Sequence, residues 1–462
     1  MDAWCDEASI GEAATIGFVK WAERLVEYPP AERMSELLHL RKTEQLGTHM
    51  AAAACFEAGD LIISENAVMR LPPLTSRAEE QLAREFGSKA SFLGPALAVN
   101  WKNVAPEVRE AVLGLFWAHP ILETAKSRLV GETRDACRAL INKNAALRDC
   151  SWEVESLLRF LHIVDLNIHR DGEARQNAEH AGLFVLGSKF SNSCAPNCRW
   201  SFTPNGCLQY HAIRRIEPGD LLTFSYIGNG MSLVEGTVAR RRRLGNLWFV
   251  CQCSRCMQPD VSRQMWCPRC KSPGCIPGES REAEGVDWTG DAPLREVIAE
   301  PSTWVCRHCG SRPAASEMPL EAEDEVSQLV PQVMDKGPDT AKEDLRTAEK
   351  LINQIEQEVG PHHWTRILAI FAWLQKALML LRTANIIDFH EGLLQERCKE
   401  LARWFEENMP DGVEQRLSVL YLVVRLSQNF EDALPCWGFS PDDPLGNGSQ
   451  IAKRMVQDSR DL

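Results

Sequence analysis

The chain has 462 residues, of which 44% are hydrophobic and 25% are charged, and its formal net charge at pH 7 is −13. This composition is typical of a globular protein of about two to four domains and excludes a largely disordered chain. The acidic balance argues against nucleic-acid binding through a basic surface and favours attraction of basic, lysine-rich peptides. No apolar run reaches the roughly 18 residues of a membrane span, so we expect no membrane segment.

The 17 cysteines favour metal binding over disulfides. The N-terminal run Met1–Glu7 is acidic and has no apolar signal core. We therefore expect a reducing compartment, the cytoplasm, the nucleus or both, in which clustered thiols bind zinc more often than they form disulfides.

In chain order, residues 1–45 are predicted to form an N-terminal helical segment. A Glu-Ala-Gly-Asp turn at 57–60 then leads into a short predicted strand at 61–63. The same turn chemistry returns as Glu-Pro-Gly-Asp at 217–220, again before an apolar run.

A long helical insert is predicted between the two turns, at about residues 74–165. A capping box at Ser76–Glu79 marks its start. Val108, Val112 and Leu115 are among the apolar residues that recur in it at helical spacing.

From Gly182 to Tyr226 the sequence predicts short strands, so the fold class is α+β. Gly, Pro and Asn separate the strand-like runs. The predicted strands cover residues 183–186, 199–202, 207–213 and 221–226. A Cys-Ala-Pro-Asn turn, Cys194–Asn197, lies among them.

A first zinc site is predicted at the cluster Cys251, Cys253 and Cys256. Three thiolates leave a structural zinc one ligand short of its usual four. Cys194 is the natural candidate, and it would tie the end of this module to its middle, beside Tyr226. The alternative is that Cys194 is only a small buried apolar residue.

A second zinc site is predicted at two Cys-x-x-Cys knuckles, formed by Cys267 with Cys270 and by Cys306 with Cys309. Paired knuckles of this kind complete a tetrahedral site in zinc ribbons. The alternative is a set of free thiols. Both sites are predicted to be structural, because four thiolates leave no open position for a catalytic water.

Toward the C-terminus the sequence predicts a helical domain. Apolar residues recur at helical spacing in successive segments, and Gly360-Pro361 and Pro410-Asp411-Gly412 separate some of them. These segments cover residues 345–359, 367–378, 394–405 and 413–424.

Together these motifs resemble the SET-domain protein-lysine methyltransferases, most closely their SET-and-MYND (Smyd) branch. There the motif reads Asn-His-Ser-Cys-x-Pro-Asn, then Gly-Glu-Glu-x-x-x-Ser-Tyr, then Cys-x-Cys-x-x-Cys. This chain has Ser191–Asn197, Gly219–Tyr226 and Cys251–Cys256 in the same order. The resemblance implies a SET domain at 46–250 around the insert, a cysteine-rich zinc region at 251–315, and a helical, tetratricopeptide-like domain at 320–462.

The resemblance further implies an S-adenosylmethionine-dependent protein-lysine N-methyltransferase that acts on a histone tail or another protein. Methyl transfer is an in-line displacement that needs alignment and a dry channel rather than a metal. Tyr226 matches the tyrosine that orients the lysine amine; the alternative is an ordinary buried tyrosine. The positions that match cofactor contacts are Gly47, His49, Met50, Asn167, Ser191, Asn192 and Phe249.

This chain departs from the family pattern at four places. His49 replaces the second glycine of a Gly-x-Gly motif, Ser191-Asn192 replaces Asn-His, and Leu247 replaces a second channel tyrosine. The segment 65–152 contains only two cysteines, so the MYND finger is predicted to be absent.

These departures keep two other hypotheses open. One is an inactive SET-like adaptor that binds protein partners through the zinc ribbon and the helical domain. The other is a zinc-ribbon transcription or chromatin factor acting through nucleic acid, which the net acidity disfavours. The run Arg240–Arg243 is interpreted as a solvated helix face rather than a nucleic-acid contact.

Overall fold

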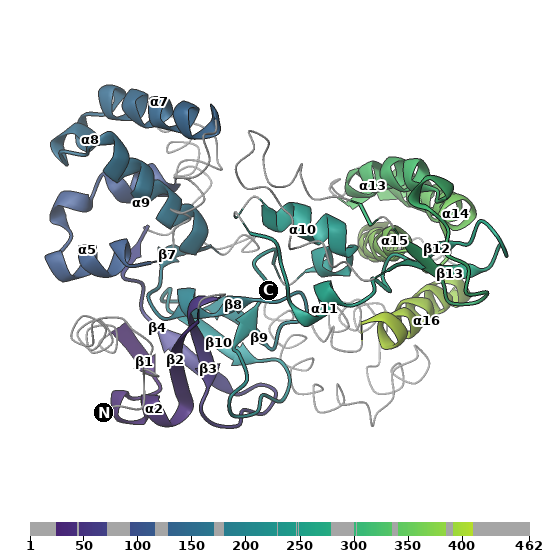
Figure 1. Ribbon diagram of the computed structural model, residues 1–462, viewed down its shortest axis with the longest axis horizontal. Helices are drawn as coiled ribbons and strands as arrows, with labels where there is room; N and C mark the ends of the chain where they lie inside the picture. Colours follow the sequence, from purple (N-terminus) through teal and green to yellow (C-terminus); the bar gives the residue numbers. More distant parts are fainter. Residues whose placement is uncertain are drawn as a thin grey trace. The chain divides into compact units, whose positions relative to one another are not determined.

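The computed structural model describes most of the chain (Figure 1). Its contacts divide the chain into two compact units. The described residues are 25–43, 46–71, 93–115, 128–170, 180–228, 230–245, 247, 249–278, 300–301, 303–334, 341–384 and 391–409. The first unit comprises Met1–Phe224, Asn246–Phe249 and Asp287–Val297, and the second comprises Ser225–Gly245, Val250–Val286 and Ile298–Leu462.

The largest sheet of the first unit has the strand order β1-β4-β10-β9, with antiparallel neighbours. Its strands are β1 (Val26–Tyr28), β4 (Leu61–Glu65), β10 (Leu208–Ala212) and β9 (Cys198–Phe202). In β10 the alternate residues Leu208, Tyr210 and Ala212 are buried, which is the period of two expected of a strand with one face on the core.

The two Gly-Asp turns of the sequence make matching backbone hydrogen bonds, each to the end of a strand from the other half of the β region. The amide of Gly59 donates to the carbonyl of Ala212 (2.8 Å), and the amide of Gly219 donates to the carbonyl of Ala52 (2.8 Å). Both glycines have φ near +95° (96° and 95°), a conformation that favours glycine. The repeated turn of the sequence therefore forms a pseudo-symmetric pair that joins the two halves of the β region.

Two strand pairs complete the part of the first unit that positions the candidate site. Antiparallel β2 (Leu38–Thr43) pairs with β3 (Gly47–Ala52), and parallel β8 (Ser191–Asn192) pairs with β11 (Thr223–Phe224). The predicted helical segment 1–45 is therefore wrong at 26–28 and at 38–43, where β1 and β2 form. Residues 1–24 lie outside the described ranges.

The described part of the insert, residues 93–115 and 128–165, is mainly helical as predicted, and an aromatic cluster lies between its segments. Trp101, Trp152 and Phe160 lie in mutual contact, with ring centroids 5.0–5.3 Å apart. The helices are α4 (Leu93–Ala98), α5 (Pro106–Leu113), α7 (Arg128–Lys143), α8 (Ala145–Asp149) and α9 (Val154–Asn167). The predicted capping box at Ser76–Glu79 lies outside the described residues.

A small sheet in the order β5-β7-β6 joins the segments before and after the insert, and one of its strands ends earlier than predicted. Its strands are β5 (Met69–Arg70), β7 (Ala181–Leu183) and β6 (Ile168–Arg170). The predicted strand 183–186 ends at Leu183, because the next residues turn around the buried Glu65. The amides of Val185, Leu186 and Gly187 all donate to the Glu65 carboxylate, at 2.8–3.0 Å.

The second unit contains a zinc-ribbon-like sheet and a helical region. Its elements before the helical region are α10 (Thr237–Gly245), α11 (Ser254–Met257), β12 (Met265–Trp266), β13 (Pro273–Pro277) and β14 (Trp304–Cys306). The three strands form one sheet in the order β12-β13-β14. Short helices in the two units are η2 (Ala31–Arg33), α2 (Met34–Leu37), η3 (Trp101–Asn103), η4 (Gly187–Lys189), η5 (Met231–Val234) and η7 (Ala315–Glu317).

The described part of the C-terminal region is helical, as the apolar spacing predicts. Its described helices are α13 (Leu320–Met334), α14 (Ala341–Glu358), α15 (Trp364–Ala384) and α16 (Glu391–Asn408). The apolar helix α15 packs against the other three (Figure 1). The predicted helix at 413–424 lies outside the described residues. Within the described ranges, no helix combines the length and apolar character needed to cross a membrane.

Candidate functional site

The candidate site is built on three backbone segments that lie side by side. The amide of Leu222 donates to the carbonyl of Met50 (3.0 Å), and the amide of Ser191 donates to the carbonyl of Leu222 (3.0 Å). The amide of Ser193 continues this pairing to the carbonyl of Phe224 (2.9 Å). The pairing brings the predicted residues of β3 and β8 to the two sides of the segment that leads into Tyr226.

Asn197, the last residue of the Cys-Ala-Pro-Asn turn, clamps this assembly. Its Oδ1 atom accepts hydrogen bonds from the amide (2.8 Å) and the hydroxyl (3.0 Å) of Thr223. Its Nδ2 atom donates to the carbonyl of Leu221 (2.9 Å). The sequence motif marked this residue without indicating its role, which is to fix the turn to β11.

β3 accommodates His49 without strain. Gly47 has φ +62°, and a Cβ added there would meet no atom within 4 Å. His49 has a negative φ, lies in register with Arg41 of β2, and is 5% exposed. Its Nδ1 atom lies 3.0 Å from the carbonyl oxygen of Gly47. The left-handed conformation is therefore needed at the first position of the Gly-x-Gly motif and not at the second.

Asn167 is held at the end of α9, where its Nδ2 atom donates to the carbonyl of Ile163 (2.7 Å). The buried His169 follows, and its ring stacks on Phe224 of β11 with centroids 5.6 Å apart. The Nε2 atom of His169 lies 2.7 Å from the Tyr210 hydroxyl. Burial lowers the pKa of His169 to about 4, so the ring is neutral at pH 7.

Neither His169 nor Tyr210 was singled out from the sequence. Their ring contacts link the end of α9 to the site segment. Tyr210 falls on a strand with period-two burial, so its sequence signal was that of an ordinary core residue.

Tyr226 lies two residues after the end of β11, and its side chain is partly exposed. Desolvation raises the pKa of its phenol above the ordinary value, so the hydroxyl stays protonated at neutral pH. Phe249 and Leu247, which follow α10, are half-buried.

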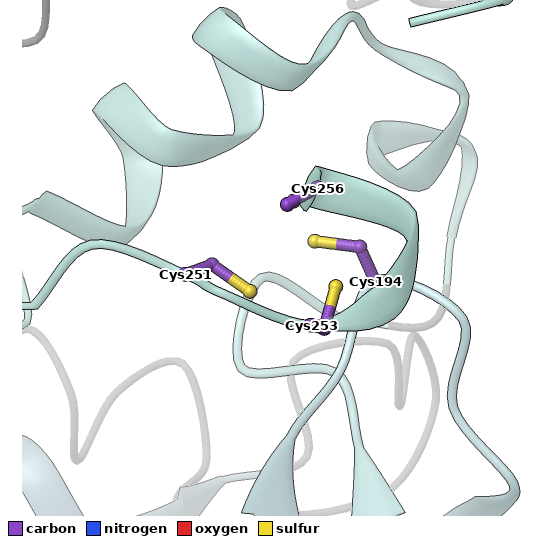
Figure 2. A group of neighbouring side chains, drawn as sticks. All are labelled: Cys194, Cys251, Cys253 and Cys256. Atoms are coloured by element: carbon purple, nitrogen blue, oxygen red, sulfur yellow. The ribbon is translucent and has the colours of Figure 1, made fainter. Parts of the chain in front are cut away.

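The predicted first cysteine group comes together. The Sγ atoms of Cys194, Cys251, Cys253 and Cys256 all lie within 4.8 Å of one another (Figure 2). Four converging thiols match the donor set of a structural zinc.

The predicted second cysteine group also comes together. The Sγ atoms of Cys267 and Cys309 are 3.8 Å apart, and those of Cys270 and Cys306 are 3.7 Å apart. Sulfurs at tetrahedral positions about 2.3 Å from a zinc ion would be about 3.8 Å apart. These two separations match a tetrahedral zinc site, and all four sulfurs lie within 4.8 Å of one another.

The two knuckles of this group are built alike. In each, the first cysteine carbonyl accepts from the amide four residues later, that of Lys271 (3.0 Å) or Gly310 (2.9 Å). These two residues have φ of 59° and 71°. Cys275 is not part of the group; its Sγ atom lies 3.8 Å from the sulfur of Met318.

The arginine run is not a solvated face throughout, so that interpretation is wrong for its first half. Arg240 is 0% exposed and Arg241 is 4% exposed. Only Arg242 and Arg243 are exposed, and they pair with Glu300 and Glu235.

Comparison with known proteins identifies the class of the domain. Residues 47–227 match the family model described as the SET domain. This range contains β3, the insert, β8 and β11, and it ends one residue after Tyr226. Residues 47–227 therefore form a SET domain, and the SET-domain resemblance expected from the motifs is confirmed.

Parts of the chain are similar to Smyd proteins and to other SET-domain methyltransferases. The chain is 29% identical over 152 residues to the chicken (Gallus gallus) protein-lysine N-trimethyltransferase SMYD5, which is 32% of each chain. It is 34% identical over 94 residues to the human SMYD5, 19% of this chain and 22% of that protein. It is 33% identical over 76 residues to the Schizosaccharomyces pombe histone-lysine N-methyltransferase set5, 16% of this chain and 23% of that protein. The chain thus spans about a third or less of the length of the curated relatives it matches.

Proposed function

We propose that the chain is an S-adenosylmethionine-dependent protein-lysine N-methyltransferase. The observation that supports this most directly is the set of three paired segments, which brings the motifs around Met50, Ser191 and Leu222 together immediately before Tyr226. The SET-domain match covers the same residues, and the relatives named above are methyltransferases by name.

The residues of these segments suit a zwitterionic nucleoside cofactor. The left-handed Gly47 has open space beside it, so the backbone can approach a ligand closely. Ser191 and Asn192 are half-buried and offer a hydroxyl and an amide. We propose that these residues bind the cofactor together with His49, Met50, Asn167 and Phe249.

Tyr226 is proposed to orient the lysine amine. S-adenosylmethionine, when bound, supplies the sulfonium methyl group. Since burial raises the pKa of Tyr226, its neutral hydroxyl can donate and accept a hydrogen bond but does not serve as a base at neutral pH. Its contribution is then alignment of the acceptor nitrogen, which is the main requirement of an in-line displacement.

Both cysteine groups are proposed to hold structural Zn²⁺. Four thiolates saturate the ion, so neither site has a position for an activated water. The metals would stabilise the module and take no part in methyl transfer.

The substrate is proposed to be a lysine side chain of a histone tail or of another protein. The net charge of −13 favours basic peptides. The C-terminal helices are proposed to form a tetratricopeptide-like domain that binds protein partners, and the chain is proposed to act in the cytoplasm or nucleus.

A second candidate function is that of a SET-like adaptor without activity. Leu247 favours it, because the side chain at that position has no hydroxyl to restrain the amine. His49 does not favour the adaptor function, because its backbone has the ordinary conformation of a strand residue.

Calorimetric titration of the full chain with S-adenosylmethionine separates the two functions. The methyltransferase proposal predicts saturable binding of one molecule per chain, weakened by Gly47→Val, which would fill the space beside the left-handed residue. The exposed turn variant Gly228→Val is a matched control, because it also adds a side chain at a positive φ in open space. Absence of binding by the unmodified chain would support the adaptor.

A further inference from the structure

Arg240 is a buried cation beside the first cysteine group. Its side chain extends from α10 and is 0% exposed. One guanidinium nitrogen, Nη2, donates to the Sγ atom of Cys256 (3.6 Å) and to the Thr237 hydroxyl (3.0 Å). The other, Nη1, donates to the carbonyl of Glu235.

This burial demands an explanation, because a guanidinium is charged at every accessible pH. Removing an isolated charge from water costs many kcal/mol unless an opposite charge compensates it. A zinc ion with four thiolates has a net charge of −2, so Arg240 and such a site would each supply the charge that the other lacks.

Arg241 strengthens the same contact from the next position of the helix. Its Nε atom donates to the carbonyl of Cys251 (3.1 Å), and its Nη2 atom donates to the carbonyl of Cys256 (3.2 Å). These bonds hold the backbone of two cysteines, whereas Arg240 contacts a sulfur directly.

The second cysteine group has a different environment. The Ser311 hydroxyl lies 3.4 Å from the sulfur of Cys267 and 3.1 Å from that of Cys309. Among the described residues, no arginine side chain donates a hydrogen bond to a sulfur of this second group. The two groups therefore share a donor set and differ in charge compensation.

We propose that Arg240 is a positioning residue that retains the metal of the first cysteine group by neutralising part of its negative charge. The inference rests on the proposed zinc sites. It assigns the first half of the arginine run to the metal rather than to nucleic acid or solvent.

The experiment measures zinc release from the full, zinc-loaded chain to an excess of a chromogenic chelator. Cys309→Ser identifies the phase that belongs to the second group. Arg240→Met keeps the length of the side chain and removes its charge. We expect it to speed release from the first group by about 10- to 100-fold, the usual effect of losing a residue that supports a metal ligand, and to leave the second group unchanged.

Two further variants separate charge from packing. Arg240→Lys keeps the charge and should restore much of the retention, which a purely packing role would not predict. Arg242→Met removes a neighbouring exposed arginine, paired with Glu300, and should release both ions at the normal rate.

Each alternative outcome overturns a defined claim. Equal acceleration at both groups would mean that Arg240→Met loosens the whole module, and unchanged release from both would mean that the arginine only fills space; either result contradicts the inference. A wild-type chain without zinc would overturn the zinc proposal itself and this inference with it. Two bound ions with unchanged release in Arg240→Met would overturn this inference alone.

Discussion

Replacement of Asn197 by alanine tests the clamp on which the candidate site depends. The side chain is 4% exposed and makes three hydrogen bonds to the β11 region. Asn197→Ala leaves the buried amide of Thr223 and the carbonyl of Leu221 without these partners. An unsatisfied buried group costs about 1–3 kcal/mol, and loss of an ordinary hydrogen bond costs about 1 kcal/mol. Together they predict a loss of about 2–4 kcal/mol in the free energy of unfolding.

The assay is urea unfolding of the full chain, with hydrogen exchange to locate the change. With a slope of about 2 kcal/mol/M, the midpoint should fall by about 1–2 M. Amides of residues 221–224 and 191–193 should exchange faster. Asn142→Ala, at an exposed position on α7, is the matched control and should change stability by less than about 0.5 kcal/mol. If Asn197→Ala unfolds like the control, the proposed clamp is wrong.

Three other predictions concern pH, zinc and the cofactor cradle. Because the folded-state pKa of His169 is about 4, below the unfolded value of about 6.5, the neutral ring contributes stability that is present above pH 6.5 and lost as the pH falls toward 4. The free energy of unfolding should therefore fall by about 3 kcal/mol less between pH 7 and pH 4 in His169→Gln than in the unmodified chain. An equal fall in both proteins, measured by denaturation, would contradict this role of His169. Metal analysis should find two zinc ions per chain, and Cys253→Ser should leave one and lower the melting temperature; a full complement of zinc in that variant would contradict the ligand assignment. Gly47→Val should weaken cofactor binding by about tenfold or more, whereas Gly228→Val, which places the same strained side chain at a positive φ, should lower the midpoint of urea unfolding similarly but leave the affinity unchanged; equal affinity of Gly47→Val and the unmodified chain would argue against a ligand at that backbone.

The features that the sequence predicted well are those with a local chemical signature. The cysteine spacings predicted both thiol groups, and the paired Gly-Asp turns, at 57–60 and 217–220, predicted equivalent positions in the fold. Helical spacing predicted the insert and the helices of the second unit, because apolar periodicity reports the buried face directly.

What the sequence missed depends on tertiary contacts. Residues 38–43 form the strand β2, in which only Leu38 to Arg41 alternate between apolar and polar residues; so short an alternation is a weak signal, and the strand depends on its pairing with β3. The strand predicted at 183–186 stops early because a distant carboxylate, Glu65, captures three amides. Burial of Arg240 was hidden because a run of four arginines is usually solvated, and only the neighbouring sulfur shows its role.

Methyl transfer is tested most directly by incubating the purified chain with labelled S-adenosylmethionine and an array of lysine-containing proteins and peptides. We expect label to be transferred to lysine, and we expect Tyr226→Phe to abolish transfer while cofactor affinity stays within about twofold. The exposed Leu46→Ala variant, beside β3, should transfer normally. Full turnover by Tyr226→Phe, or cofactor binding without transfer to any substrate of the array, would contradict the proposed methyltransferase function.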